Sequence, residues 1–167
     1  MKPDDDAVSL SIRPAGAADV EALGRLGALL VKVHHDFDAA RFIAPTPRTE
    51  AGYGGFLAGQ LERKDVVVLV AEAAGEVVGY TYAAVEGNDW LTLRGPAGVI
   101  HDLMVLPERR KHGVGRQLLT ETIAALERMG APQVQLSTAE RNVAAQRLFA
   151  SLGFRPTMIE MTREVPG

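Results

Sequence analysis

The sequence contains no cysteine. This absence excludes disulfides, thiolate nucleophiles and zinc–thiolate sites, so any catalysis must use oxygen, nitrogen or backbone groups. No stretch approaches the roughly 18 consecutive apolar residues that would span a bilayer. The acidic residues 1–6 also lack the basic and apolar regions of a signal peptide. We therefore expect a cytoplasmic protein that has no membrane partner.

The sequence also has no excess of positive charge. The formal net charge is -3, which argues against nucleic acid as a partner but leaves room for a local basic patch. Hydrophobic residues make up 47% and charged residues 23%, which are ordinary values for a globular protein. A length of 167 residues suits one hydrophobic core. We expect a single domain over residues 1–167, with residues 1–7 as a disordered tail.

Apolar periodicity predicts an α/β protein. A period of two, as in Val8, Leu10 and Ile12, indicates a half-buried strand, whereas a spacing of three or four indicates a helix. The predicted strands cover residues 8–13, 66–71, 77–85, 99–106, 133–137 and 154–163. The predicted helices cover residues 19–34, 49–63, 114–129 and 142–152. This order predicts one mixed sheet with helices on both faces.

A basic turn lies between the strand 99–106 and the helix that follows it. Residues 109–115 read Arg-Arg-Lys-His-Gly-Val-Gly, and the first turn of a helix leaves backbone N–H groups without partners. Glycine at positions 113 and 115 removes β-carbons, and the helix dipole adds positive potential, so the turn suits a pyrophosphate. Solvated charges beside a tight turn would fit the same local pattern without a ligand. Neither a P-loop nor a dinucleotide-binding G-x-G-x-x-G is present.

The turn carries a family resemblance. Residues 110–115 match at every fixed position the cofactor motif of the GNAT superfamily, which is Arg or Gln, two residues, Gly, one residue, and Gly or Ala. Residues 102–110 resemble the family's strand leading into that turn. The residues that resemble its following segment are Asn142, Ala145, Leu148, Phe149, Gly153 and Phe154. The chain is thus similar to acetyl-CoA-dependent N-acetyltransferases over about residues 99–156.

The resemblance implies a fold and a cofactor. The fold is a mixed, mostly antiparallel sheet of six or seven strands flanked by about four helices on both faces. The cofactor is acetyl-CoA, with CoA as the product. In the family, amides of the turn hold the pyrophosphate and the preceding strand pairs with the pantetheine arm. The implied cofactor-binding residues are Leu103, Met104, Val105, Arg110, Lys111, His112, Gly113, Val114, Gly115, Arg116, Asn142 and Phe149. Asn142 is also a candidate for an ordinary helix N-cap.

The resemblance implies direct transfer of the acetyl group to an amine. The backbone amide of Met104 or Val105 is the candidate oxyanion donor, because a fixed dipole needs no reorganisation. His101 is the candidate general base, since an imidazole exchanges its proton near neutral pH, and it stands where many relatives carry a glutamate. Alternatively, His101 only lines the site and Asp102 hydrogen-bonds the backbone.

The acid that protonates the leaving thiolate is harder to identify. Many relatives have a tyrosine where this chain has Phe149, and phenylalanine has no proton to donate. Ser137 is the first candidate, and Tyr80, Tyr82 or water are the others.

The acceptor is expected to bind between the loops 35–48 and 87–98, whose sequences contain no motif that identifies it. The candidates for binding the amine are Phe42, Tyr53, Tyr82, Glu86 and Asp89. The run His34–Asp38 is not expected to bind a metal, because adjacent residues of a helix point in different directions. The acceptor is predicted to be a small-molecule or peptide amine. The alternative function is a non-catalytic acyl-CoA sensor. The net charge disfavours acetylation of aminoacyl-tRNA. By analogy with the family, the protein is a candidate homodimer.

Overall fold

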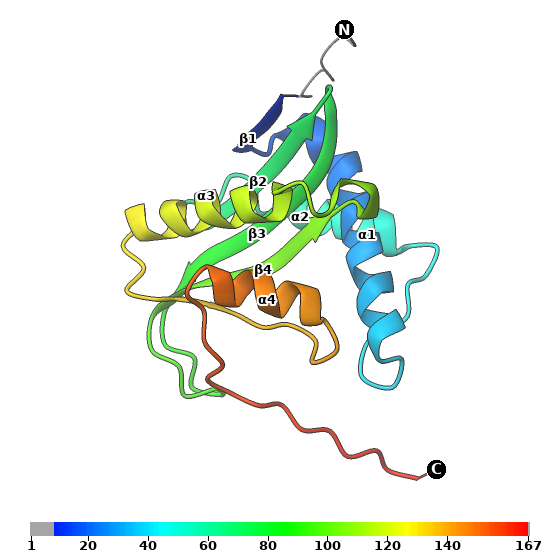
Figure 1. Ribbon diagram of the computed structural model, residues 1–167, viewed down its shortest axis with the longest axis vertical. Coiled ribbons are helices and arrows are strands. Elements are labelled where there is room, and N and C mark those ends of the chain that lie inside the picture. The colour runs from blue at the N-terminus through cyan, green and yellow to red at the C-terminus, as the bar shows by residue number, and fades with distance from the viewer. Residues whose placement is uncertain (1–8, 167) are drawn as a thin grey trace, which may run out of the picture.

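The computed structural model describes residues 9–166, and the predicted tail over residues 1–7 lies outside them. One mixed sheet forms the centre of the molecule, in the order β1-β2-β3-β4-β5 (Figure 1). The first four strands pair with one another in antiparallel fashion, and β5 runs parallel to β4. The strand bounds are β1 Leu10–Pro14, β2 Val66–Ala73, β3 Glu76–Glu86, β4 Ala97–Val105 and β5 Val134–Leu136.

The expectation of six or seven strands is wrong for the described residues, which form five. The predicted strand over residues 154–163 is not formed. Its large apolar side chains Met158, Ile159 and Met161 are exposed, and adjacent apolar residues cannot share one buried face of a strand. In Figure 1 this segment runs away from α4 without pairing to the sheet.

The described residues contain four α-helices and two short 3₁₀ segments. The helix bounds are α1 Val20–Phe37, α2 Thr49–Ala58, α3 Val114–Arg128 and α4 Val143–Ser151, and the 3₁₀ segments are η1 Ala17–Asp19 and η2 Pro107–Arg109. The second helix is shorter than the predicted 49–63, because the chain leaves it at Gly59. None of the helices in residues 9–166 is long and apolar enough to cross a membrane.

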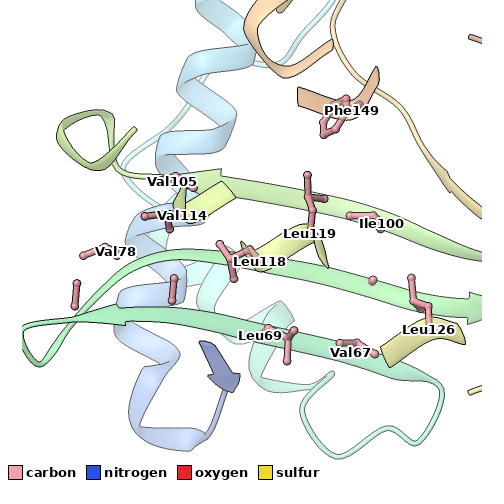
Figure 2. Close-up of a cluster of buried hydrophobic side chains, with 13 residues drawn as sticks. Val67, Leu69, Val78, Ile100, Val105, Val114, Leu118, Leu119, Leu126 and Phe149 are labelled. Atoms are coloured by element: carbon pink, nitrogen blue, oxygen red, sulfur yellow. The ribbon is translucent and has the colours of Figure 1, made fainter. Parts of the chain in front are cut away.

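Successive side chains of a strand point to opposite sides of the sheet, and here they enter two separate clusters. Val67 and Leu69 of β2 belong to one buried cluster with Leu118 and Leu119 of α3 and, at its other end, Phe149 of α4 (Figure 2). The alternate β2 residues join a second cluster with Tyr80, Met104 and residues of α1 and α2. Its buried members are Leu23, Leu26, Leu57, Val68, Val70, Tyr80 and Met104. Each cluster therefore fixes a different pair of helices.

Glycines allow α1 and α2 to approach closely. A β-carbon on Gly27 would lie 2.1 Å from Cδ1 of Tyr53, and one on Gly24 would lie 2.6 Å from the carbonyl oxygen of Glu50. Neither distance is compatible with a real β-carbon. The Tyr53 ring consequently lies against the backbone of α1, and this contact fixes its direction toward the sheet.

Strands β4 and β5 separate near the middle of β4. Their pairing covers only Gly98 to Ile100 of β4. Beyond Ile100, the same edge of β4 has no partner strand among the described residues. This opening in the sheet leads to the site.

Candidate active site

The turn into α3 depends on two residues in the left-handed backbone region. Lys111 has φ 64° and Gly113, the N-cap of α3, has φ 80°. The first intrahelical hydrogen bond runs from the N–H of Gln117 to the carbonyl oxygen of Gly113, at 3.0 Å. The backbone N–H groups of residues 111–116 donate no hydrogen bond within residues 9–166. These donors lie at the positive end of a 15-residue helix, which is a favourable place for an anion.

The two glycines of the turn have different roles. A β-carbon on Gly113 would meet nothing within 4 Å, so glycine there serves the positive φ. A β-carbon on Gly115 would lie 3.3 Å from Cδ2 of Leu148 and 3.8 Å from Cγ2 of Val105. Gly115 therefore lets the start of α3 pack closely against α4 and the end of β4.

Two basic side chains of the turn are bound within the protein. Nε of Arg110 donates to the carbonyl oxygen of Val105 at 3.1 Å, and Nη2 of Arg116 donates to Oγ of Ser151 at 2.7 Å. These contacts tie the turn to the ends of β4 and α4. No such contact within residues 9–166 is made by the other basic side chains of the turn, those of Arg109, Lys111 and His112. They are therefore available to an anion together with the backbone N–H groups.

A small cavity of about 70 Å³ lies at the opening between β4 and β5. It brings together residues that the sequence predicted for the site, from β4, the loop after β5 and α4. The predicted residues that line it are His101, Leu103, Ser137, Asn142 and Phe149. The Asn142 side chain accepts a hydrogen bond from the N–H of Ala145 at 3.2 Å, so the N-cap that was one of the two predictions for this residue is formed.

A larger cavity of about 230 Å³ lies next to the first. It is lined by residues from α1, the loop after α1 and β4, namely Leu30, Val31, His34, Phe42, Ile43, His101 and Asp102. The two cavities share the lining residues Leu30, His34, His101 and Asp102. They therefore form two ends of one cleft that leads from α4 toward α1.

Asp102 is the most buried charged residue of the cleft, with 8% of its surface exposed. The hydroxyls of Tyr53 and Tyr80 both donate to its Oδ2, at 2.7 Å and 3.0 Å. The other oxygen, Oδ1, accepts no hydrogen bond within residues 9–166 and is not fully buried. The expectation that Asp102 hydrogen-bonds the backbone is wrong, because two tyrosines from α2 and β3 reach it instead.

Burial controls the protonation of this group of three side chains. It raises the pKa of Asp102 above the usual 3.8, and the two tyrosine hydrogen bonds oppose that rise. Burial and the neighbouring carboxylate raise the pKa of Tyr53 and Tyr80 well above the usual range. The tyrosines thus remain hydrogen-bond donors, and one face of the Asp102 carboxylate is left for a ligand.

His101 belongs to a second polar group at the edge of the cleft. Its Nε2 lies 2.7 Å from Oε1 of Glu86, and its ring stacks on Tyr82 with the centroids 5.1 Å apart. Nη2 of Arg94 donates to the other Glu86 oxygen at 2.7 Å. Glu86 can therefore stabilise a positive charge on His101 while Arg94 holds the carboxylate in place.

The remaining predicted residues divide into two sets. Phe42 lines the larger cavity, and Tyr53 reaches the cleft through Asp102. Asp89 does not line either cavity, because its carboxylate accepts hydrogen bonds from Leu91 and Thr92 in its own loop.

Sequence reasoning missed the tyrosine pair on Asp102 and the position of His34 in the cleft. The spacing of 49 residues between Tyr53 and Asp102 gives no local signal of contact. The one available sign was a charged residue inside an otherwise apolar strand, which requires a buried partner. No group of three or more potential metal ligands occurs in residues 9–166.

Residues 31–154 match the Acetyltransferase (GNAT) family, which covers more than half of the chain. The chain therefore belongs to this family. The membership confirms the resemblance drawn from the turn.

Several known proteins resemble the chain over different lengths. Mycothiol acetyltransferase of Thermobispora bispora is 42% identical over 89 residues, which are 51% of this chain and 28% of that protein. The uncharacterised N-acetyltransferase YhfO of Bacillus subtilis is 30% identical over 103 residues, 62% of this chain and 68% of that protein. The chain thus spans less than a third of the mycothiol acetyltransferase and about two thirds of YhfO.

The fold is also similar to a solved structure. The aminoglycoside N-acetyltransferase AAC(6')-Iy in complex with CoA superposes with a TM-score of 0.70, covering 99% of each chain at 17% identity. A likeness at this identity shows the fold. The five strands and four helices described here are a GNAT-like α/β arrangement.

Proposed function

We propose that this protein transfers the acetyl group of acetyl-CoA directly to a primary amine of a small molecule or peptide. The observation that carries the proposal is the set of unpaired N–H groups of residues 111–116 at the start of α3. Backbone donors at a helix N-terminus bind phosphate groups well, and the CoA pyrophosphate supplies two of them. The unpaired edge of β4 begins beside this turn and leads into the cleft.

The proposal assigns the rest of CoA to that edge. The backbone of Leu103 to Val105 would pair with the amides of the pantetheine arm, in the direction of the smaller cavity. Phe149, which is almost fully buried, lines that cavity and offers an apolar surface to the arm. The thioester then lies near the junction of the two cavities, where Asp102 and His101 face the acceptor.

In the proposed reaction the amine nitrogen attacks the thioester carbonyl carbon, and the bond from that carbon to sulfur breaks. The backbone amide of Val105 is the proposed donor to the carbonyl oxygen as it gains negative charge, because the amide of Met104 faces β3 within the sheet. His101 is the proposed acceptor of the amine proton, and Glu86 would stabilise the imidazolium at 2.7 Å. The CoA thiolate takes a proton from Ser137 or from water, because Phe149 has none to give.

Replacement of Gly113 tests the cofactor assignment. Gly113 and Gly130 stand at opposite ends of α3, both have positive φ, and a β-carbon added to either would meet no atom within 4 Å. Gly113→Val and Gly130→Val should therefore carry similar backbone strain, on the order of 1–3 kcal/mol. Only Gly113→Val should weaken CoA binding, by about 10-fold or more, because its side chain and altered backbone disturb the amides of the turn.

Titration calorimetry with CoA measures that difference. Equal affinities of the two variants, or no heat of association with the wild type, would contradict the proposal. Thiol release from acetyl-CoA in the presence of amines then separates an enzyme from a non-catalytic sensor. A sensor would bind CoA tightly and release no thiol with any amine.

A further inference from the structure

The larger cavity places one carboxylate among apolar side chains. Leu30 and Val31 of α1 and Phe42 and Ile43 of the following loop form its apolar lining. Asp102 is the only carboxylate that lines either cavity within the described residues. The nearby Glu86 is already paired with His101 and Arg94. A ligand in this cavity thus meets one carboxylate, the imidazoles of His34 and His101, and an apolar wall.

His34 and His101 lie close enough to the Asp102 carboxylate to lower its pKa, but neither is bonded to it. No Lys, Arg or His within residues 9–166 forms an ion pair with it. A buried carboxylate without a counter-charge is costly, and two neutral hydroxyl donors offset only part of that cost. Both donors also occupy Oδ2, so Oδ1 is the atom that can accept a hydrogen bond from a ligand. An ammonium group supplies both the missing charge and the missing donor.

The wall of the cavity limits the part of the ligand that it contacts. The cavity is open to solvent, and its volume of about 230 Å³ is below the roughly 300–1,000 Å³ that is typical of pockets for drug-sized ligands. Ile43 lines the cavity although its side chain is 78% exposed, so a ligand there would cover apolar surface that water now contacts. A second cationic group would meet no other carboxylate among the described residues that line the two cavities.

We infer that the acceptor is a small monoamine with one apolar substituent, bound with its ammonium nitrogen on Oδ1 of Asp102 and its substituent against Leu30, Val31, Phe42 and Ile43. The inference rests on the proposed function, because it names the acceptor class of the same site. It excludes polycationic amines as the preferred substrates. Asp102 holds the nitrogen near the thioester. The ammonium gives one proton to water before the nitrogen attacks, and His101 takes the second as the amide forms.

An amine panel tests the acceptor class. Thiol release is measured with 2-phenylethylamine, hexylamine, spermidine and kanamycin at fixed acetyl-CoA. The expected order of kcat/KM places the first two at least about 10-fold above the polycations, since only the monoamines match one carboxylate and an apolar wall. A preference for spermidine or kanamycin would overturn the inference while leaving the transferase proposal intact. Failure to bind CoA in calorimetry would instead overturn the transferase proposal.

Two variants test the residues. Asp102→Asn should lower kcat/KM for 2-phenylethylamine by about 100-fold, mainly through KM, and leave CoA affinity unchanged. Ile43→Asp should lower kcat/KM for hexylamine and raise it for spermidine, because it adds a second carboxylate at an exposed position that the fold does not require. A thermal melt of each variant checks that it is folded. Unchanged kinetics for a folded Asp102→Asn variant, or an unaltered hexylamine-to-spermidine ratio for Ile43→Asp, would overturn the inference.

Discussion

The turn before α3 and the cleft around Asp102 are built in opposite ways. The turn presents backbone N–H groups from consecutive residues, and its geometry depends on the dihedral angles of Lys111 and Gly113. The cleft presents side chains from α1, α2, β3 and β4, and its geometry depends on how these elements pack. The first region should therefore tolerate most side-chain changes that preserve its backbone. The second should be sensitive to changes in packing far from the cleft.

The change expected to disturb the cleft most is the replacement of Gly27 by alanine. A methyl group at this position would lie 2.1 Å from the Tyr53 ring, so α2 must move or Tyr53 must leave Asp102. Gly27→Ala should lower the free energy of unfolding by about 2 kcal/mol or more and reduce amine turnover, although neither residue touches CoA in the proposed complex. Denaturant unfolding and thiol-release kinetics measure the two effects.

Gly52→Ala is the matched control for that change. Gly52 lies on α2, and a β-carbon there would meet nothing within 4 Å. Alanine in a helix interior is favoured over glycine by about 0.5–1 kcal/mol, so this variant should be slightly more stable than the wild type and fully active. Equal stabilities of the two alanine variants would show that α1 and α2 do not pack as described.

A smaller effect is expected from the charge of Asp102, and it depends on pH. Because burial raises the pKa of Asp102 above 3.8, the folded protein binds this proton more tightly than the unfolded chain does. The resulting stabilisation is fully present below pH 3.8 and is lost as the pH rises through the folded-state pKa. Asp102→Asn cannot ionise, so its stability relative to the wild type should increase over that pH range.

Unfolding curves at a series of pH values measure this change. Near pH 7 the Asp102→Asn variant should be within about 1 kcal/mol of the wild type or more stable, because it no longer buries a charge and its amide oxygen has two lone pairs to accept the tyrosine hydrogen bonds. A stability difference that does not change with pH would show that Asp102 is not desolvated in the folded protein. If the Asp102→Asn variant keeps its stability but loses amine turnover, the Asp102 charge serves catalysis and not folding.

The same contrast explains what could be predicted from the sequence. The turn and the helix after it were predicted because glycine spacing, basic residues and apolar periodicity are local signals. Residues 110–115 carry the first two, and residues 114–129 carry the third. The hairpin of β2 and β3 was predicted for the same reason. The strand over residues 154–163 was predicted wrongly, since its apolar residues carry a β-like composition but meet no neighbouring strand.

The acceptor side of the site could be predicted only in part. Phe42 and Tyr53 were placed in it by the family resemblance and Glu86 by its loop, but their partners were not predicted. The contact between Tyr53 and Asp102 depends on the close approach of α1 and α2 at Gly24 and Gly27. Helix-to-helix approach of this kind leaves no pattern within either segment. Asp102 was therefore assigned to the backbone when two distant tyrosines hold it.

The smallest effect is expected from Lys111, and it separates the backbone of the turn from its charges. Lys111 has φ 64°, which costs a non-glycine residue about 1–2 kcal/mol, so Lys111→Gly should relieve strain and stabilise the protein by up to that amount. Its exposed ammonium should contribute at most about 1 kcal/mol to anion binding, which corresponds to a change in CoA affinity of about 5-fold or less. Lys111→Gln, which removes the charge without changing the backbone preference, is the control. If both variants bind CoA almost as well as the wild type, the backbone amides hold the pyrophosphate. If both variants lose CoA binding altogether, side-chain charge controls ligand binding at the turn, as it is proposed to do in the cleft.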